Sequence, residues 1–170
     1  MLSRYLEKAM KILFVCIGNI CRSPMAEGVF RRFLQEEGLA GEIEVASAGT
    51  MAYRKGLPPD ERTINTAASR GIDLSSFIVR KIDDDDFADY DLILAMEENV
   101  FSELKSLRPH YGEEFKKAEL KLFMDFVPDE AGNDVHDPYY GGADGFERMY
   151  QTIEKGCKNL ITFLKNKVTE

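Results

Sequence analysis

Residues 11–28 read KILFVCIGNICRSPMAEG, and this stretch decides the fold. Its first part, Lys11 to Cys16, is a short apolar run that is typical of a strand buried on both faces. The Ser23-Pro24 pair then favours the start of a helix, because a serine hydroxyl can cap the first turn and proline is tolerated in it. The helix is expected to end at Gly38 and to present one apolar face, formed by Met25, Ala26, Val29, Phe30, Phe33 and Leu34.

The rest of the chain continues the alternation of strands and helices. Apolar runs predict further strands at residues 43–46, 91–96 and 120–123, and periodic patterns predict helices at residues 60–70, 97–107 and 146–165. Such an alternation implies a parallel sheet that is covered on both faces. We therefore expect an α/β fold of one domain, a three-layer sandwich with a four-stranded parallel sheet. Ligands of such folds bind beyond the carboxyl ends of the strands, where residues 16–23 lie.

Composition and charge exclude several classes of function. The 170 residues suit a single domain, and 30 acidic against 22 basic residues give a net charge of −8. No basic stripe indicates a nucleic-acid partner, and no apolar run approaches the ~20 residues that cross a bilayer. Residues 1–9 lack the apolar core of a secretory signal and are interpreted as an N-terminal extension before a domain at residues 10–170. We expect a cytoplasmic protein that binds neither nucleic acid nor membranes.

The cysteine, histidine and acidic residues give no sign of a disulfide scaffold or a metal centre. The two histidines, His110 and His136, do not show the spacing of zinc ligands. The run Asp83 to Asp86 lacks the spaced ligands of a calcium loop and is interpreted as the solvated first turn of a helix. No metal or other cofactor is therefore expected. The cysteines are odd in number, which favours free thiols in a chain without an export signal: Cys16, Cys21 and Cys157.

The loop between the first strand and the first helix carries the chemistry. Cys16 and Arg22 enclose five residues there, a CX5R pattern, and a loop of this length can wrap into a nest of backbone N–H groups that binds an anion. The positive end of the helix points at the same place. The guanidinium of Arg22 matches two phosphate oxygens, while Gly18 and Asn19 tolerate unusual backbone dihedrals. The loop therefore predicts a phosphate site with further contacts from Ile17, Gly18, Asn19, Ile20, Cys21 and Ser23.

Cys16 is the candidate nucleophile at the base of this loop. Electropositive surroundings favour the thiolate form of a cysteine, which can attack phosphorus in line. The hydroxyl of Ser23 can donate a hydrogen bond to the thiolate and help it to depart in a second step. A cysteine that ends a strand is otherwise a small core residue, and only the following GNICRS favours the catalytic interpretation.

The segment VCIGNICRSPMAEG, residues 15–28, resembles the signature of the low-molecular-weight protein-tyrosine phosphatases. The similarity covers about residues 10 to 165 and extends, in the same order, to SAGT, GLPPDER, GIDLSS and DPYYGG. The resemblance implies hydrolysis of phosphotyrosine through a cysteinyl-phosphate intermediate, without a metal. It also implies tyrosine-phosphorylated proteins as partners, inorganic phosphate and other oxyanions as inhibitors, and a monomer or weak dimer.

The same resemblance assigns roles outside the loop. The family's general acid is the aspartate of a DP motif, here Asp137; from the residues alone, Asp137 stands out only because a proline and two aromatics follow it. The family also uses aromatic residues to grip the substrate ring, and these positions correspond to Tyr53, Tyr139 and Tyr140. Each tyrosine could instead simply pack its loop, and Tyr140 could equally be a regulatory phosphorylation site.

Two positions behind and within the loop are also implied by the resemblance. Asn19 and Ser47 correspond to a pair that holds the loop in shape, and many members add a histidine after a segment like GIDLSS. This chain has Phe77 there, so we expect a different anchor or a loop that is held less tightly. Cys21 corresponds to a residue that can form a reversible disulfide with Cys16, although it could equally be a buried thiol that fills space.

Three other functions stay open at this point. Thioredoxin-coupled arsenate reductases share the CX5R loop but need two more cysteines near residues 80–95, and this stretch has none. Phosphoarginine phosphatases usually carry threonine at the position of Ile20, so isoleucine favours an aryl phosphate. A catalytically silent phosphotyrosine-binding module would lack the nucleophile or the acid, and this chain keeps both.

Overall fold

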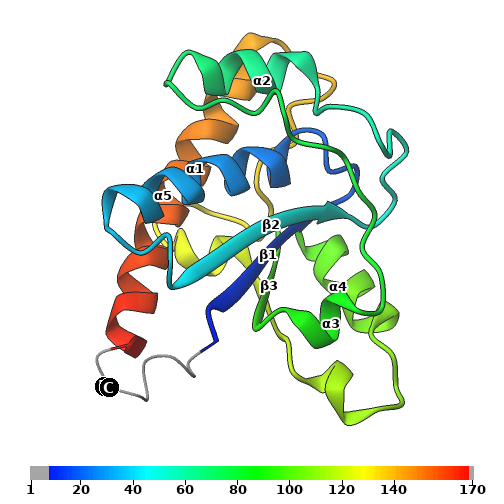
Figure 1. Ribbon diagram of the computed structural model, residues 1–170. Helices are drawn as coiled ribbons and strands as arrows, with labels where there is room; N and C mark the ends of the chain where they lie inside the picture. The colour runs from blue at the N-terminus through cyan, green and yellow to red at the C-terminus, as the bar shows by residue number, and fades with distance from the viewer. Residues whose placement is uncertain (1–7, 169–170) are drawn as a thin grey trace.

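The computed structural model describes residues 8–168 of the chain (Figure 1). Residues 1–7, most of the predicted N-terminal extension, lie outside the described residues. Among the described residues, the strands are β1 (Met10–Cys16), β2 (Ile43–Gly49), β3 (Leu92–Ala95) and β4 (Glu119–Leu122). The helices are α1 (Arg22–Glu36), α2 (Glu61–Ala68), α3 (Asp86–Asp89), α4 (Glu98–Leu107) and α5 (Ala143–Val168), with 3₁₀ turns η2 (Glu113–Lys116) and η3 (Phe123–Phe126).

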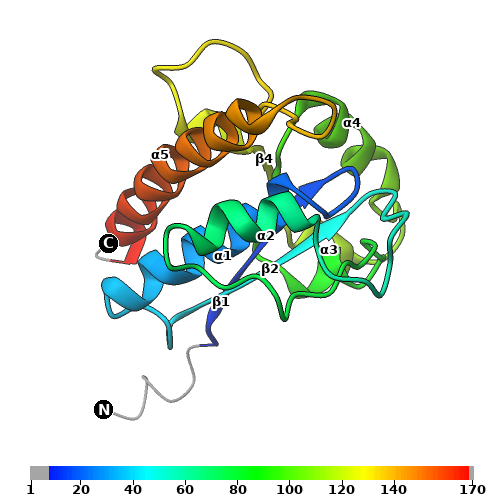
Figure 2. The same ribbon diagram turned by 90° about the horizontal axis from the view of Figure 1, so that it is seen from above.

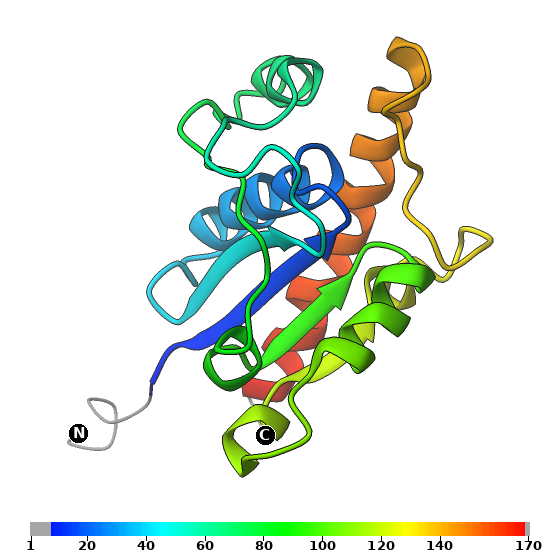
Figure 3. The same cartoon turned by 90° about the vertical axis from the view of Figure 1, so that its right-hand side faces the viewer.

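The strands form one parallel sheet in the order β2-β1-β3-β4, which confirms the predicted four-stranded sheet. β1 is central, and its last residue, Cys16, pairs with Gly49 of β2. On its other side, Val15 pairs with Ala95 of β3. Because all pairs are parallel, the carboxyl ends of the strands meet at one edge of the sheet, and the predicted phosphate loop leaves from the middle of that edge (Figure 3).

Alternate residues of β1 face two separate apolar layers. Ile12 and Phe14 point to the layer under α1 and α5, while Leu13 and Val15 point to the layer under α3 and α4. Phe14 packs edge-on against Phe30 of α1, with 5.7 Å between the ring centroids. Figure 2 shows α1 and α5 together on one side of the sheet and α4 on the other. The sheet is therefore covered on both faces, and the predicted three-layer sandwich is confirmed.

The predicted capping role of Ser23 is wrong. α1 begins at Arg22, so Ser23 lies inside its first turn, and the N-cap residue Cys21 makes no side-chain cap. Pro24 sits in the first turn, as its fixed backbone angle favours. The hydroxyl of Ser23 contacts the loop instead, because the loop folds back over the start of the helix.

The interpretation of residues 83–86 as a solvated turn is wrong for Asp86. This side chain is buried, and its two carboxylate oxygens each accept a hydrogen bond of 3.0 Å from Arg80. Burial disfavours the charge on Arg80, but the hydrogen bond and the negative charge of Asp86 outweigh it and raise the pKa of Arg80. The ion pair holds the segment that runs beside β2, where the N–H of Gly49 donates to the carbonyl of Arg80.

The long helix α5 is amphipathic. Its buried face carries five fully enclosed side chains, and Cys157 among them confirms the predicted core position: Met149, Ile153, Cys157, Leu160 and Leu164. Its other face is charged. Among residues 8–168, no helix is long and apolar enough to cross a membrane.

Gly156 of α5 packs directly against the ring of Phe123, and the contact leaves no room for a side chain at residue 156. A Cβ atom there would lie 2.3 Å from Cζ of Phe123 and 3.0 Å from Cγ2 of Val127, and both residues are fully buried. A glycine-to-alanine change inside a helix ordinarily adds stability of up to about 1 kcal/mol. At this position we expect Gly156→Ala to lower the free energy of unfolding by about 1–3 kcal/mol, because a filled core must shift.

Urea denaturation of Gly156→Ala, with the exposed Gly41→Ala as the control, measures this difference. No atom lies within 4 Å of a Cβ built on Gly41. A Gly156→Ala protein as stable as wild type would contradict the packing of α5 on Phe123.

Candidate active site

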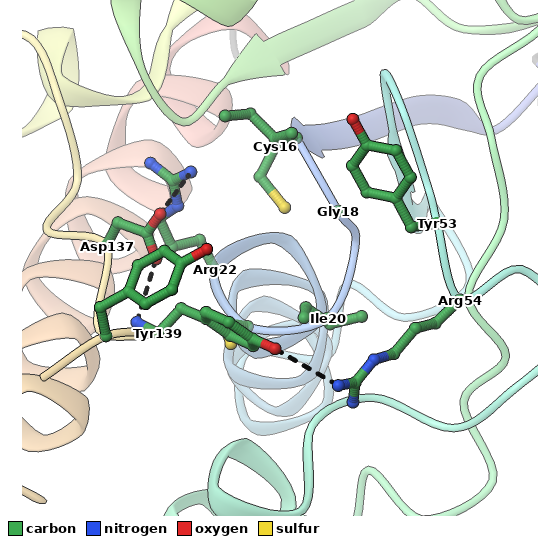
Figure 4. A pocket seen from close by; sticks show the side chains of 11 residues that line it. Cys16, Gly18, Ile20, Arg22, Tyr53, Arg54, Asp137 and Tyr139 are labelled. Carbon is green, nitrogen blue, oxygen red and sulfur yellow. Dashed lines mark hydrogen bonds and ion pairs between the residues drawn. The ribbon is translucent and has the colours of Figure 1, made fainter. Parts of the chain in front are cut away.

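The loop between β1 and α1 forms the floor of a pocket at the carboxyl edge of the sheet. Cys16 is 3% exposed and lies at the bottom of this pocket, whose volume is about 310 Å³. The backbone N–H of Asn19 donates to Sγ of Cys16 over 3.2 Å, and Asn19 has a φ of 56°. Figure 4 shows Sγ pointing into the pocket, with Asp137 and Arg22 on one side and Tyr53 on the other. The loop thus curls around the thiol.

The side chain of Asn19 fixes the loop from three directions. Its Nδ2 donates to Oγ of Ser23 over 2.8 Å and to Oγ of Ser47 over 3.0 Å, while its Oδ1 accepts the N–H of Arg80 over 3.0 Å. These bonds join the loop to α1, β2 and the segment after α2. Three hydrogen bonds offset the cost of the left-handed backbone at this residue.

Ser23 connects this network to the thiol. Its Oγ lies 3.0 Å from Sγ of Cys16 and 3.3 Å from the carbonyl oxygen of Ala48. Because Asn19 donates to the same oxygen, the single hydroxyl proton of Ser23 is free to point at the sulfur or at that carbonyl. The arrangement can therefore deliver one hydrogen bond to a thiolate.

Arg22 is a buried cation between two acidic side chains. Its Nη1 donates to Oε2 of Glu97 over 2.8 Å and to the carbonyl of Val135 over 3.2 Å, and its Nη2 lies 3.7 Å from Oδ2 of Asp137. Burial disfavours the charge of Arg22, but negative charge at Cys16 and the Glu97 carboxylate outweigh burial and raise its pKa. The guanidinium is thus held charged in the pocket wall.

Asp137 reaches the pocket from the long connection before α5. Its side chain is about half exposed, and Oδ1 accepts the N–H of Tyr139 over 3.1 Å. The structure therefore brings together Cys16, Arg22 and Asp137 in the wall of one pocket, although they are far apart in the sequence.

Aromatic and apolar side chains form the rim of the pocket. Tyr53 and Tyr140 are largely exposed, and the rings of Tyr139 and Tyr140 meet edge-to-face with centroids 4.9 Å apart. The Nη2 of Arg54 donates to the hydroxyl of Tyr139 over 3.3 Å. The predicted pocket residues Ile17, Gly18, Ile20 and Cys21 also line this cavity, whereas Asn19, Ser23 and Ser47 lie behind it.

Sequence reasoning missed two side chains at this site. Glu97 follows β3 at the edge where ligands of parallel sheets bind, and this position was the available signal for it. Arg54 follows Tyr53 directly, but no pattern in the sequence distinguishes it from other surface cations. Among residues 8–168, no group of three or more His, Cys, Asp or Glu side chains is arranged to hold a metal ion.

Gly49 supports the loop from below and leaves no room for a side chain. A Cβ atom there would lie 2.6 Å from the carbonyl oxygen of Ile17 and 2.9 Å from the backbone N of Asn19. These are backbone atoms of the loop itself, so they cannot rotate away. We expect Gly49→Ala to weaken binding of orthophosphate about tenfold or more, because the displaced loop no longer points its N–H groups at one position.

Isothermal titration of Gly49→Ala and of the exposed Gly41→Ala with orthophosphate tests this expectation. Equal affinities of the two variants would show that the loop keeps its shape without the close approach of Gly49.

Cys21 is a free, buried thiol that stays protonated. Burial, together with the nearby Asp60 and Cys16, raises its pKa to about 12, although the side chain of Thr63 opposes the shift. The folded state thus holds this proton where the unfolded thiol, with a usual pKa of 9.0, would lose it. The stability that Cys21 contributes is therefore present below pH 9.0 and is lost as the pH rises toward about 12.

We expect iodoacetamide near neutral pH to leave Cys21 of the folded protein unreacted, because its raised pKa keeps it as the unreactive thiol, and to label Cys16, whose sulfur points into the pocket. Peptide mass spectrometry after brief labelling, with a urea-unfolded sample as the control, identifies the modified residue. Labelling of folded Cys21 as fast as Cys16 would contradict its raised pKa.

Comparisons with known proteins agree over nearly the whole chain. The family model of the low molecular weight phosphotyrosine protein phosphatases matches residues 11–170. The low molecular weight protein-tyrosine-phosphatase YfkJ of Bacillus subtilis is 38% identical over 157 residues, which is 92% of this chain and 96% of that protein.

Solved structures give the same result. A crystal structure of a protein tyrosine phosphatase from Entamoeba histolytica has a TM-score of 0.85 and 38% identity, covering 94% of this chain and 99% of that one. A Drosophila arginine phosphatase structure also reaches 0.85, with 30% identity over 92% of this chain and 98% of that one. A cysteine pocket with Arg22 and Asp137 in its wall lies on a fold shared with these enzymes, and the chain belongs to the low molecular weight phosphotyrosine protein phosphatase family.

Proposed function

We propose that this protein hydrolyses phosphotyrosine in proteins, with Cys16 as the nucleophile, Arg22 and the loop N–H groups as the phosphate site, and Asp137 as the general acid and base. One observation carries the proposal. The thiol at the floor of the pocket shares that pocket with a buried guanidinium and with a half-exposed carboxylate 3.7 Å from this guanidinium.

The pocket provides separate places for the phosphate and the ring of the substrate. The phosphate would lie over Cys16, where the N-terminal end of α1 and Arg22 supply positive charge. The phenyl ring would lie in the rim between Tyr53 and Tyr139, which leaves the peptide outside. Tyr140, at the outer edge of the rim, would contact the peptide rather than the phosphate.

The reaction would proceed in two steps. Sγ of Cys16 attacks phosphorus as the bond to the phenolic oxygen breaks, and Asp137 gives its proton to that oxygen. Water then attacks the phosphocysteine while Asp137 takes a proton from it, and the sulfur leaves as a thiolate that accepts a hydrogen bond from Ser23. Arg22 and the loop amides hold the three equatorial oxygens and bind them most strongly in the transition state.

Phosphoarginine is the second candidate substrate, because the Drosophila arginine phosphatase shares the fold with this chain. Ile20 opposes it: the side chain lines the pocket and packs against the core, where it offers a guanidino group no hydrogen bond. The cytoplasmic location, the monomer or weak dimer, and the redox role of Cys21 stay predictions from the sequence.

Turnover of matched phosphotyrosine, phosphoserine and phosphoarginine peptides in a metal chelator tests the reaction class. We expect phosphotyrosine to be preferred and Cys16→Ser to abolish turnover. Asp137→Asn should lower kcat/KM by about 10²–10⁴ for phenyl phosphate and by less for p-nitrophenyl phosphate, whose leaving group needs no proton. The exposed Asp144→Asn serves as the matched control.

Preference for phosphoarginine would replace the substrate and keep the mechanism. Equal losses for the two phenyl esters in Asp137→Asn would remove Asp137 from the role of acid. Tight phosphotyrosine binding without turnover would support a silent binding module.

A further inference from the structure

We propose that Glu27 is a positioning residue for the phosphate loop: it fixes the Ser47 hydroxyl, and through it Asn19, in the place of the histidine that this chain lacks at Phe77. The kinetic part of its test depends on the proposed function. The binding part does not.

A continuous chain of hydrogen bonds joins Glu27 to the thiol. Ser47 Oγ donates to Oε1 of Glu27 over 2.8 Å and accepts from Nδ2 of Asn19 over 3.0 Å. The same Nδ2 donates to Ser23, whose Oγ lies 3.0 Å from Sγ of Cys16. Each link is close to the ideal length for its atoms.

The direction of this chain is set at its Glu27 end. A carboxylate only accepts, so the single proton of Ser47 must point to Glu27 and the oxygen must accept from Asn19. At the other end, the Asn19 oxygen accepts the N–H of Arg80, which leaves the Asn19 amide to donate to both serines. Without Glu27, the Ser47 hydroxyl could turn its proton toward Asn19 and oppose the network.

The charge of Glu27 is kept in place by Arg31. Glu27 is a buried carboxylate in the middle of α1, and burial raises its pKa, against the opposing effects of Ser47 and Arg31. Oε2 lies 2.7 Å from Nη2 of Arg31, which also donates to the carbonyl of Val45. Both carboxylate oxygens therefore have partners, as a buried charge requires.

Phe77 completes this arrangement without a polar contact. Its ring cannot hydrogen-bond Ser47, and it lies 5.6 Å from the guanidinium of Arg31 instead. A cation over an aromatic face is stabilised by the ring's negative face. With Phe77 at this position, the Ser47 hydroxyl donates to Glu27 rather than to a histidine.

α1 itself provides a matched control, because its next ion pair has the same spacing but faces solvent. Arg32 and Glu36 are also four residues apart, with 3.0 Å between Nε and Oε1, and both side chains are about half exposed. If Glu27 were only a helix-stabilising charge, Glu27→Ala and Glu36→Ala would have the same effect.

The experiment compares Glu27→Ala, Glu27→Gln and Glu36→Ala by orthophosphate affinity, kcat/KM for p-nitrophenyl phosphate and the rate of Cys16 alkylation. We expect Glu27→Ala to weaken phosphate binding and to lower kcat/KM about tenfold, and to change the alkylation rate. Glu27→Gln keeps an acceptor oxygen and should stay within about threefold of wild type. Glu36→Ala should match wild type in all three measurements.

A double-mutant cycle tests whether Glu27 acts through Ser47. Ser47→Ala should cause the same loss of phosphate affinity as Glu27→Ala combined with Ser47→Ala, because Glu27 acts only through Ser47. If Glu27→Ala folds poorly, Ser47→Ala alone keeps the test valid, because it removes the same link and should weaken phosphate binding by a similar factor. Phe77→His in the Glu27→Ala background should restore phosphate affinity, since the imidazole can accept from Ser47.

Equal phosphate affinities of Glu27→Ala and Glu36→Ala, additive losses from Glu27→Ala and Ser47→Ala, or a Ser47→Ala protein with the phosphate affinity of wild type, would overturn the proposal. If wild type shows no phosphatase turnover, the proposed function fails, and phosphate affinity and alkylation still decide the role of Glu27.

Discussion

The site depends on keeping one residue, Asn19, in a backbone conformation that an isolated chain would avoid. Only with Asn19 in the left-handed region does its N–H turn toward the Cys16 sulfur while the chain enters α1 in register. Its side chain supplies the stabilisation by bonding to three different segments. The missing side chain of Gly49 lets the loop lie directly against the end of β2. Backbone shape, rather than a concentration of basic side chains, therefore makes the anion site.

This explains how a chain with a net charge of −8 can offer a place for a phosphate. The cation that matters, Arg22, is buried and surrounded by acidic groups, and these groups fix its orientation. Around it, the loop amides and the start of α1 contribute partial charges that do not enter the formal count. The outer surface can stay acidic, because solvent and salt screen distant surface charges and the electric field inside the pocket comes mainly from the groups that line it.

The sequence predicted the strand-loop-helix unit, the parallel sheet and its layers because each rests on local periodicity. It also pointed to Cys16, Arg22 and Asp137, the last through family resemblance more than through physics. The burial of Asp86 and the contact of Glu97 with Arg22 were not predicted, because a charged residue looks alike in the sequence whether its partner is water or a buried side chain. Glu97 also lies 75 residues from Arg22, and no local pattern connects the two. The anchor that replaces the histidine at Phe77 was expected, but the structure was needed to point to Glu27.

The bonding of Arg22 has a consequence for the order in which the protein can be made. Its two hydrogen-bond partners, Glu97 and the carbonyl of Val135, lie 75 and 113 residues further along the chain. Parallel strands also cannot pair through short hairpins, so β1 waits for β2 and β3 to emerge. During synthesis on a ribosome, the loop can begin to curl while the N-terminal third is outside the exit tunnel. Arg22, however, gains its last hydrogen-bond partner only after residue 135 has left the tunnel. The phosphate pocket is therefore completed late in synthesis.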